Sequence, residues 1–218
     1  TATDYVDLGD RMLFSGSGFG EVINRGTINV SEGGFAVLAA PYVANSGLIR
    51  ADLGSITLAS TNAFTLDMRG DGLITFQVAS SLIDAIAADG DRLGIDNTGV
   101  LQSRSGIITI AGNLASEVVA GVINLDGIID ADAFGAGHHG STVLISAVDD
   151  LNLTGAISAD GGVDGHGGTI ITNAGGLNDF TANASVSVRG GSEAGDGGFI
   201  ELSGQSLRVR GDIDAGAD

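Results

Sequence analysis

The chain repeats one phrase, and this repetition constrains its fold more than any other feature. Residues 24–40 read NRGTINVSEGGFAVLAA, and residues 45–60 read NSGLIRADLGSITLAS. The first copy begins at Asn24 and the second at Asn45. Each copy holds Asn-x-Gly, an apolar pair, a polar gap, a Gly and an apolar–polar alternation. A fixed period of roughly 20 to 50 residues is typical of repeat proteins, in which each unit buries its apolar face against the next.

Further copies follow at longer spacings. Residues 97–101 match residues 45–49, and the interval between these two copies would hold two or three further turns of the pattern. Gly127 and Gly155 open two successive units, and Gly211 follows Gly155 at twice the interval between them. The last copy is incomplete, so we expect the protein to continue beyond this piece.

The apolar bursts between these positions predict strands. Each burst is short, rich in β-branched residues and bounded by Gly, Asn or Asp, which is typical of strands joined by turns. Stacked units would pair in parallel about 4.8 Å apart, with Ile49 and Leu101 in one column. We therefore predict an all-β fold, a right-handed parallel β-helix (β-solenoid) of about nine or ten coils. Residues 80–88, SSLIDAIAA, form an exception, because their spacing predicts a short helix.

The repeats also predict an organisation and a set of turn positions. We expect one β-helix segment over residues 1–218, with a capping or entry region (1–20), coils of about 20–26 residues (21–111) and coils of about 28 residues (112–218). Asn and Gly tolerate positive φ, and an Asn amide could bond its counterpart in the next coil. The predicted structural turn positions are Asn24, Gly26, Asn45, Gly47, Asn97, Gly99, Gly127, Gly155 and Gly211.

Composition excludes several classes of function. The chain has 27 acidic and 9 basic residues and a net charge of −18, so it lacks the basic patches that nucleic acid or an anionic membrane needs. It has no cysteine, which excludes disulfides and Cys-based zinc sites. Its apolar runs are far shorter than the roughly 20 residues of a membrane span, so we expect no membrane insertion.

Several phrases resemble a known family. Residues 14–60, FSGSGFGEVINRGTINVSEGGFAVLAAPYVANSGLIRADLGSITLAS, together with TLDMRGDGLITFQV at 65–78, resemble the secreted exoproteins of bacterial two-partner secretion, the filamentous haemagglutinin-like adhesins. GAISADGGVDGHGGTIIT and GGSEAGDGGFIEL resemble the later repeats of such exoproteins. The family's Asn-Pro-Asn motif is absent, because the single proline, Pro41, follows Ala40. The piece either begins downstream of that motif or belongs to a divergent member.

This resemblance implies a function. It implies a right-handed parallel β-helix, export through an outer-membrane β-barrel transporter, and a secreted or bacterial cell-surface location. The expected role is a structural rod that serves adhesion, biofilm cohesion or presentation of a distal activity, with a surface glycan, a protein or a matrix polysaccharide as partner. The alternatives are a carbohydrate-active β-helix enzyme and a calcium-dependent matrix or surface-layer protein. We predict no enzymatic activity and no cofactor.

The candidate chemical sites all have a simpler structural interpretation. His139 and His166 lie close to one coil apart, with Asp164 nearby. Such a set could hold a transition metal, but solvated loop residues in Gly-rich turns are the favoured interpretation. DGGVDGHGG and GSEAGDGG resemble calcium-binding β-roll repeats without their nine-residue spacing, so calcium stays a minor hypothesis. Asp132, Asp160 and Arg189 fall in one column, where an Arg would relieve carboxylate repulsion.

Overall fold

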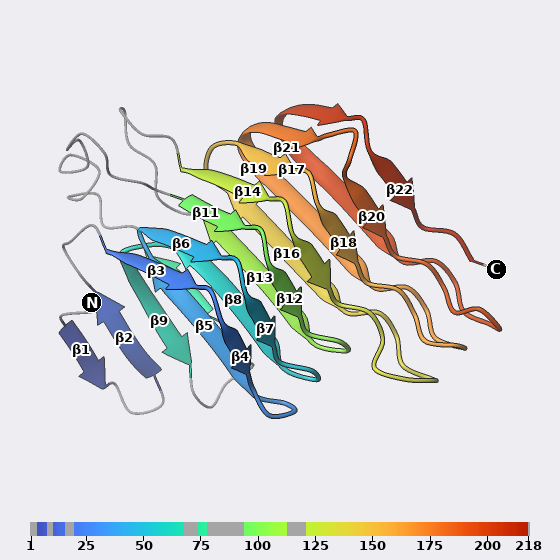
Figure 1. Cartoon of the computed structure of the whole chain (residues 1–218), viewed down its shortest axis with the longest axis horizontal. Helices are drawn as coiled ribbons and strands as arrows, with labels where there is room; N and C mark the ends of the chain where they lie inside the picture. Colours follow the sequence, from blue (N-terminus) through green and yellow to red (C-terminus); the bar gives the residue numbers. More distant parts are fainter. Residues whose placement is uncertain are drawn as a thin grey trace.

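The chain folds into three β-sheets. The computed structural model describes residues 4–7, 11–15, 20–67, 74–77, 94–112 and 121–217. Within these ranges the chain is all-β and contains no helix. Two parallel sheets run along the molecule, and a small antiparallel sheet lies at its N-terminal end (Figure 1).

Sheet C defines the repeat. Its seven strands pair in parallel and in chain order. They are β4 (Thr27–Asn29), β7 (Leu48–Arg50), β12 (Val100–Gln102), β15 (Ile128–Asp130), β18 (Ala156–Ser158), β20 (Ser185–Ser187) and β22 (Asp212–Asp214). Ile49 pairs with Leu101, which confirms the predicted register of these two positions. We call the strands that one passage of the chain adds to the parallel sheets a level.

Sheet B forms the other two sides. It has 11 parallel strands and folds round in a nearly closed arrangement beside sheet C. One row holds β3 (Glu21–Asn24), β6 (Tyr42–Asn45), β11 (Gly94–Asn97), β14 (Val122–Leu125) and β17 (Leu151–Leu153). The other row holds β5 (Phe35–Ala40), β8 (Ser55–Ser60), β13 (Ile107–Gly112) and β16 (Thr142–Ala147). The long strands β19 (Thr169–Phe180) and β21 (Phe199–Val209) join the rows, because each contributes one half to each row.

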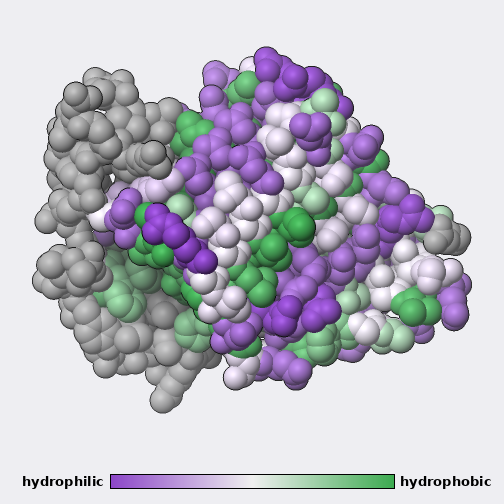
Figure 2. Space-filling view, viewed as in Figure 1, coloured by the Kyte–Doolittle hydropathy of each residue, from purple (hydrophilic) through white to green (hydrophobic). Residues whose placement is uncertain are grey.

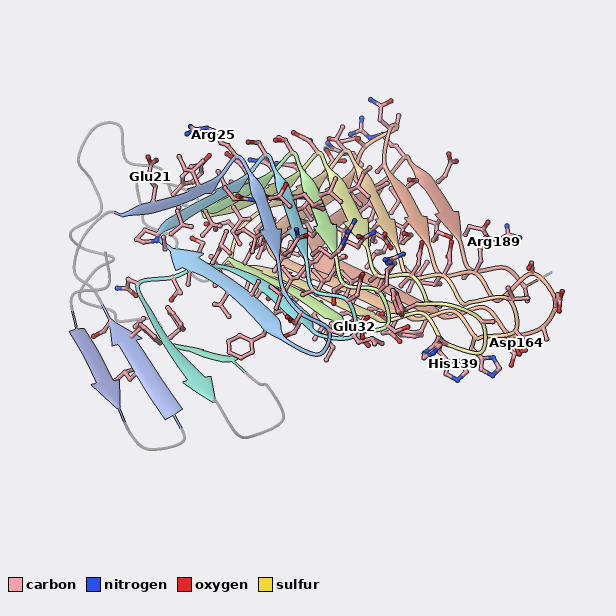
Figure 3. All side chains as sticks on the ribbon, turned by 60° about the horizontal axis from the view of Figure 1, so that its bottom comes forward. Glu21, Arg25, Glu32, His139, Asp164 and Arg189 are labelled. Atoms are coloured by element: carbon pink, nitrogen blue, oxygen red, sulfur yellow. The ribbon has the colours of Figure 1, made fainter. Side chains whose placement is uncertain are left out.

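Sheet A is antiparallel and separate from the stack. Its order is β1 (Asp4–Asp7), β2 (Arg11–Ser15), β9 (Ala63–Asp67) and β10 (Ile74–Gln77). Figures 1 and 3 both place it beside the first levels. The rings of Phe14 and Phe64 stack at 4.7 Å between centroids, and this contact joins β2 to β9.

The predicted right-handed parallel β-helix of about nine or ten coils is wrong. The described chain is a parallel β-rich fold in which sheet C has seven strands, sheet B is nearly closed, and four strands form an antiparallel sheet. The number of coils was overestimated from the long interval between Asn45 and Asn97. In the structure β11 pairs directly with β6, so this interval adds no further level between them. After β7 and β8 the chain leaves the stack and supplies β9 and β10 to sheet A. An apolar–polar alternation has a period of two in both parallel and antiparallel strands, so it cannot tell them apart.

The predicted helix at residues 80–88 lies outside the described residues.

In the later levels the register passes from Leu125 to Leu153 and then to Phe180, so successive levels are nearly equal in length. The short alternations within each level keep one face of every strand inward.

The core is a set of apolar columns inside the three faces. Ile49, Leu101, Ile129, Ile157 and Val186 form one column along sheet C, and each is at most 1 % exposed. A second column on sheet B holds Ile56, Ile108, Val143 and Ile170, all fully buried. Burying such a side chain contributes about 1.5–3 kcal/mol. On the outside, rows of polar and apolar side chains follow the length of the stack (Figure 2).

Candidate functional site

The predicted Asn–Gly turns lie at one corner, where the β3–β17 row of sheet B turns into sheet C. The Asn24 amide nitrogen donates to the Asn45 amide oxygen at 2.8 Å, and Asn45 donates in the same way to Asn97 at 2.8 Å. The amide oxygens of Asn24 and Asn45 also accept from the backbone N–H two residues on. This arrangement confirms the expected amide bonds between neighbouring levels and fixes each turn locally.

The asparagine column ends after the third level. Leu125 pairs with Asn97, and Leu153 and Phe180 continue the column. Asn97 is fully buried, and its side-chain nitrogen has no hydrogen-bond partner among the described residues. An unpaired buried amide is costly, so the join between the amide column and the apolar column is a local weak point.

Glycine is needed at this corner for a reason different from the predicted one. None of the nine predicted turn positions has positive φ. Instead, a Cβ on Gly47, Gly99, Gly127 or Gly155 would lie 2.0–2.2 Å from the carbonyl oxygen of the preceding level, and one on Gly211 would lie 2.3 Å from the Ala184 oxygen. Gly26, in the first level, has nothing within 4 Å. The glycines permit close approach between levels rather than a left-handed backbone.

Positive φ occurs at the next corner, at two residues that the sequence did not single out. Leu53 and Ser105 have φ of 58° and 50°, and Gly33 has 73° at the equivalent place in the first level. In all three turns the following residue, such as Gly54, donates its N–H to a carbonyl three residues back. Leucine rarely adopts this conformation.

An ion pair beside this corner was also missed. Arg104 donates to both carboxylate oxygens of Asp52, with 2.9 Å for the shorter bond, and its guanidinium lies 5.0 Å from the Phe134 ring centroid. The Arg104 side chain holds the pKa of Asp52 below its usual range. Asp52 and Arg104 have the same separation in sequence as Asn45 and Asn97, so that repeat interval could have placed them in one column.

From the fourth level on, the same corner carries long loops. We call residues 132–140, 160–167 and 189–197 the loop cluster. A backbone hydrogen bond closes the base of each loop: Ser141 to Ala131 at 2.9 Å, Gly168 to Ala159 at 2.7 Å and Gly198 to Val188 at 2.7 Å. Compact loops with close ends are frequently functional. The cluster projects from one edge of the molecule, where Figure 3 labels His139 and Asp164.

Glycine lets the three loops stack on each other. A Cβ on Gly165 would lie 1.9 Å from the His138 carbonyl oxygen, and one on Gly167 would lie 2.0 Å from the Val188 carbonyl oxygen. Gly162 donates its N–H to His138, and Gly191 donates to Gly165. The loops therefore form a layered surface held by backbone contacts.

The predicted histidine pair is brought together. The rings of His139 and His166 stack at 4.9 Å between centroids. His166 donates its backbone N–H to His139 Nδ1 at 2.9 Å, and Asp196 donates its backbone N–H to His166 Nδ1 at 2.8 Å. Asp164 accepts from the Gly137 N–H. A ring whose Nδ1 accepts carries its proton on Nε2, and this arrangement opposes the metal hypothesis, because Nε2 then has no free lone pair.

No metal cluster is evident elsewhere in the described part of the chain. The His, Asp and Glu side chains of this part form no group of three or more that could hold a metal ion. The calcium hypothesis stays a prediction.

The acidic column beneath the loops differs from the prediction in one contact. Asp160 donates its backbone N–H to Asp132 at 2.8 Å, and Arg189 donates its backbone N–H to Asp160 at 2.7 Å. The Arg189 guanidinium, however, forms its ion pair with Asp214 at 2.8 Å, one level further on. Burial is the main cause that raises the pKa of Asp132, and the neighbouring charges of Asp130 and Asp160 add to it.

Comparison with known proteins gives no family. Neither a scan against protein-family models nor a search of curated proteins finds a match to this chain. In the described residues no helix has the length and apolar character needed to cross a membrane. The geometry alone therefore defines the class: an acidic, parallel β-rich repeat protein with a cluster of stacked loops along one edge.

Proposed function

We propose that the chain is a structural and presenting segment of a secreted or cell-surface, adhesin-like bacterial exoprotein. The observation that carries this proposal is the in-register stacking of the levels together with loops that all project from one corner. Stacked levels make a stiff support, and loops on a rigid support are common binding surfaces. The resemblance of residues 14–60 to two-partner secretion exoproteins supports the same function.

The chemistry of the described residues favours presentation over catalysis. Three aspartates of the described residues already have basic partners: Asp52 pairs with Arg104, Asp179 with Arg208 and Arg210, and Asp214 with Arg189. Glycoside hydrolysis needs two carboxylates across an open groove. On this proposal the partner is a surface glycan, a surface protein or a matrix polysaccharide, and an outer-membrane β-barrel transporter exports the chain.

A binding experiment tests this function. The intact chain would be immobilised and exposed to bacterial cells, epithelial cells and purified polysaccharides. The matched variant replaces each long loop with the tight turn that residues 103–106 form in the third level. We expect the intact chain to retain at least one surface, and the shortened variant to keep a β-type circular dichroism spectrum but lose that binding. Absence of binding by the intact chain, or equal binding by a folded shortened variant, would contradict the proposal.

A further inference from the structure

We propose that His139 and His166 form an acid-released clip that holds the loop cluster in its stacked form. Each imidazole belongs to one loop and accepts a backbone N–H from the next: His139 accepts from His166, and His166 accepts from Asp196. Two successive interfaces between loops therefore each include one bond to an unprotonated Nδ1, beside backbone bonds from Gly140 to His166 and from Gly167 to Asp196. This inference concerns a conformational property of the loops and stands whether or not the proposed adhesive function is correct.

Protonation removes the acceptor. A neutral imidazole has one donor and one acceptor nitrogen, whereas an imidazolium has two donors. With Nδ1 protonated, each ring would direct an N–H at a backbone N–H, and both bonds would be lost. The two rings are also stacked at 4.9 Å, so a second positive charge would repel the first. Histidine is the side chain that ordinarily changes charge near neutral pH.

The charges around the two rings make the clips unequal. The charged and titratable groups of the loops are His138, Asp164, Glu193 and Asp196, with Asp132, Asp160 and Arg189 at the loop bases. An Asp196 carboxylate oxygen lies 3.5 Å from His166 Nδ1 and could accept from it once it is protonated. Within the described residues His139 has no such ion pair. The clip at His139 is therefore expected to open more completely than the clip at His166.

The remaining contacts limit how far the loops open. The base bonds from Ser141, Gly168 and Gly198 do not depend on a side chain that titrates, and neither do the bonds between loops from Gly162 to His138 and from Gly191 to Gly165. The loop tips have little apolar burial, since Val163 is 43 % exposed and its glycine neighbours have no side chain. Acid is thus expected to loosen the tips and to leave the stacked sheets intact.

Amide hydrogen exchange on the intact chain measures the clip directly. The protection factor of the His166 and Asp196 amides is the intrinsic exchange rate divided by the observed rate. It would be measured from about pH 7.5 to about pH 5, the interval in which imidazole ordinarily titrates. We expect the protection factors of these two amides to fall by about fivefold to tenfold, the change that corresponds to the net contribution of one hydrogen bond. Amides of the core strand β13 are expected to keep their protection.

Two kinds of substitution, His→Asn and His→Phe, separate the clip from a general effect of acid. In His139→Asn and His166→Asn the amide Oδ1 stands near the place of Nδ1 and accepts at every pH, so protection should no longer depend on pH. In His139→Phe the ring stack remains without an acceptor, so the His166 amide should be weakly protected at both pH values. His138→Asn is the control, because the His138 side chain makes no such bond in the described structure, and it should behave as the unchanged chain does.

The proposal is overturned if the unchanged chain shows the same protection of both amides at both ends of this pH range. It is also overturned if the His→Asn variants retain the full pH dependence, because the titrating group would then lie elsewhere. If the intact chain bound no surface at neutral pH, that result would count against the proposed function and would leave the clip unaffected.

Discussion

At the residue scale, one residue type has different surroundings in successive levels. Asn45 is 1 % exposed, accepts from Asn24 and donates to Asn97, so both ends of its amide are used. The side-chain nitrogen of Asn97 is unpaired among the described residues, because Leu125 follows it in the column. Aspartates differ in the same way. Asp52 lies beside the Arg104 guanidinium, whereas Asp132 lies beside the carboxylates of Asp130 and Asp160.

The two aspartates are expected to affect stability with opposite sign. The pKa of Asp52 is lowered mainly by its bond to Arg104, so its contribution is present above the unfolded pKa and is lost as pH falls through the lowered value. The pKa of Asp132 is raised mainly by burial, so the folded state gains stability as pH falls through the raised value. We expect Asp52→Asn to destabilise the chain at pH 7 and Asp132→Asn to stabilise it slightly.

Urea unfolding at pH 7 and at pH 4 checks this pair. The Asn side chain in Asp132→Asn keeps an oxygen for the Asp160 N–H, so the comparison isolates the charge. The advantage of this variant should shrink at the lower pH. A destabilised Asp132→Asn at pH 7, or an Asp52→Asn without effect, would show that these pKa shifts do not govern stability.

At the element scale, spacing between levels decides which residues are tolerated. Strands of neighbouring levels approach so closely that the corner following each β3-row strand has no room for a Cβ, except in the first level. The second to fifth levels therefore require glycine at positions whose φ is not positive, whereas Ala184 holds the equivalent position in the sixth level. A sequence pattern shows that glycine recurs there, but it gives no reason, because positive φ and close approach select the same residue.

Gly99→Ala tests close approach. Its Cβ would lie 2.2 Å from the Gly47 oxygen, so we expect a loss of about 1–3 kcal/mol or more from overpacking. Gly26→Ala is the matched control, since it occupies the same column with nothing within 4 Å, and it should stay within about 0.5 kcal/mol of the unchanged chain. Chemical denaturation followed by circular dichroism gives both values. Equal losses in the two variants would show that backbone conformation, not spacing, requires glycine.

At the scale of the whole molecule, the last described level of the stack pairs on one side only. In the described chain β22 pairs with β20 alone and β21 with β19 alone. The inward positions there are exposed, with Leu207 at 48 %, Val209 at 43 % and Ile213 at 44 %. In repeat proteins each unit contacts only its neighbours, so stability is a sum of unit and interface contributions. The last level has one interface instead of two.

This geometry predicts unequal costs along one column. Ile157 is 1 % exposed and lies in the same inward column as Ile213. Ile157→Ala is expected to cost about 2–5 kcal/mol, as for other fully buried side chains. Ile213→Ala should cost less than half as much, because a large part of the side chain is already in water. Urea unfolding measures both, and similar costs would mean that the end of the stack is covered in solution.

Much of the repeat could be predicted from the sequence. The alternation of apolar residues set the inward columns, and the offsets correctly paired Ile49 with Leu101 and Asn45 with Asn97. Both follow from local chemistry: a strand exposes alternate faces, and stacked equivalents share their surroundings. The stacking of His139 on His166 was also accessible, because their separation in sequence equals the step of one level from Leu153 to Phe180.

The sequence by itself therefore determined strand identity, inward faces and level-to-level register, because each depends on residues within one repeat length. Only the tertiary structure decided how many levels exist, because strand direction leaves no trace in a period of two, and β9 and β10 left the stack for an antiparallel sheet. It also decided why glycine is required and which atoms of His139 and His166 are engaged. Those properties arise from distances between levels, which no single repeat contains.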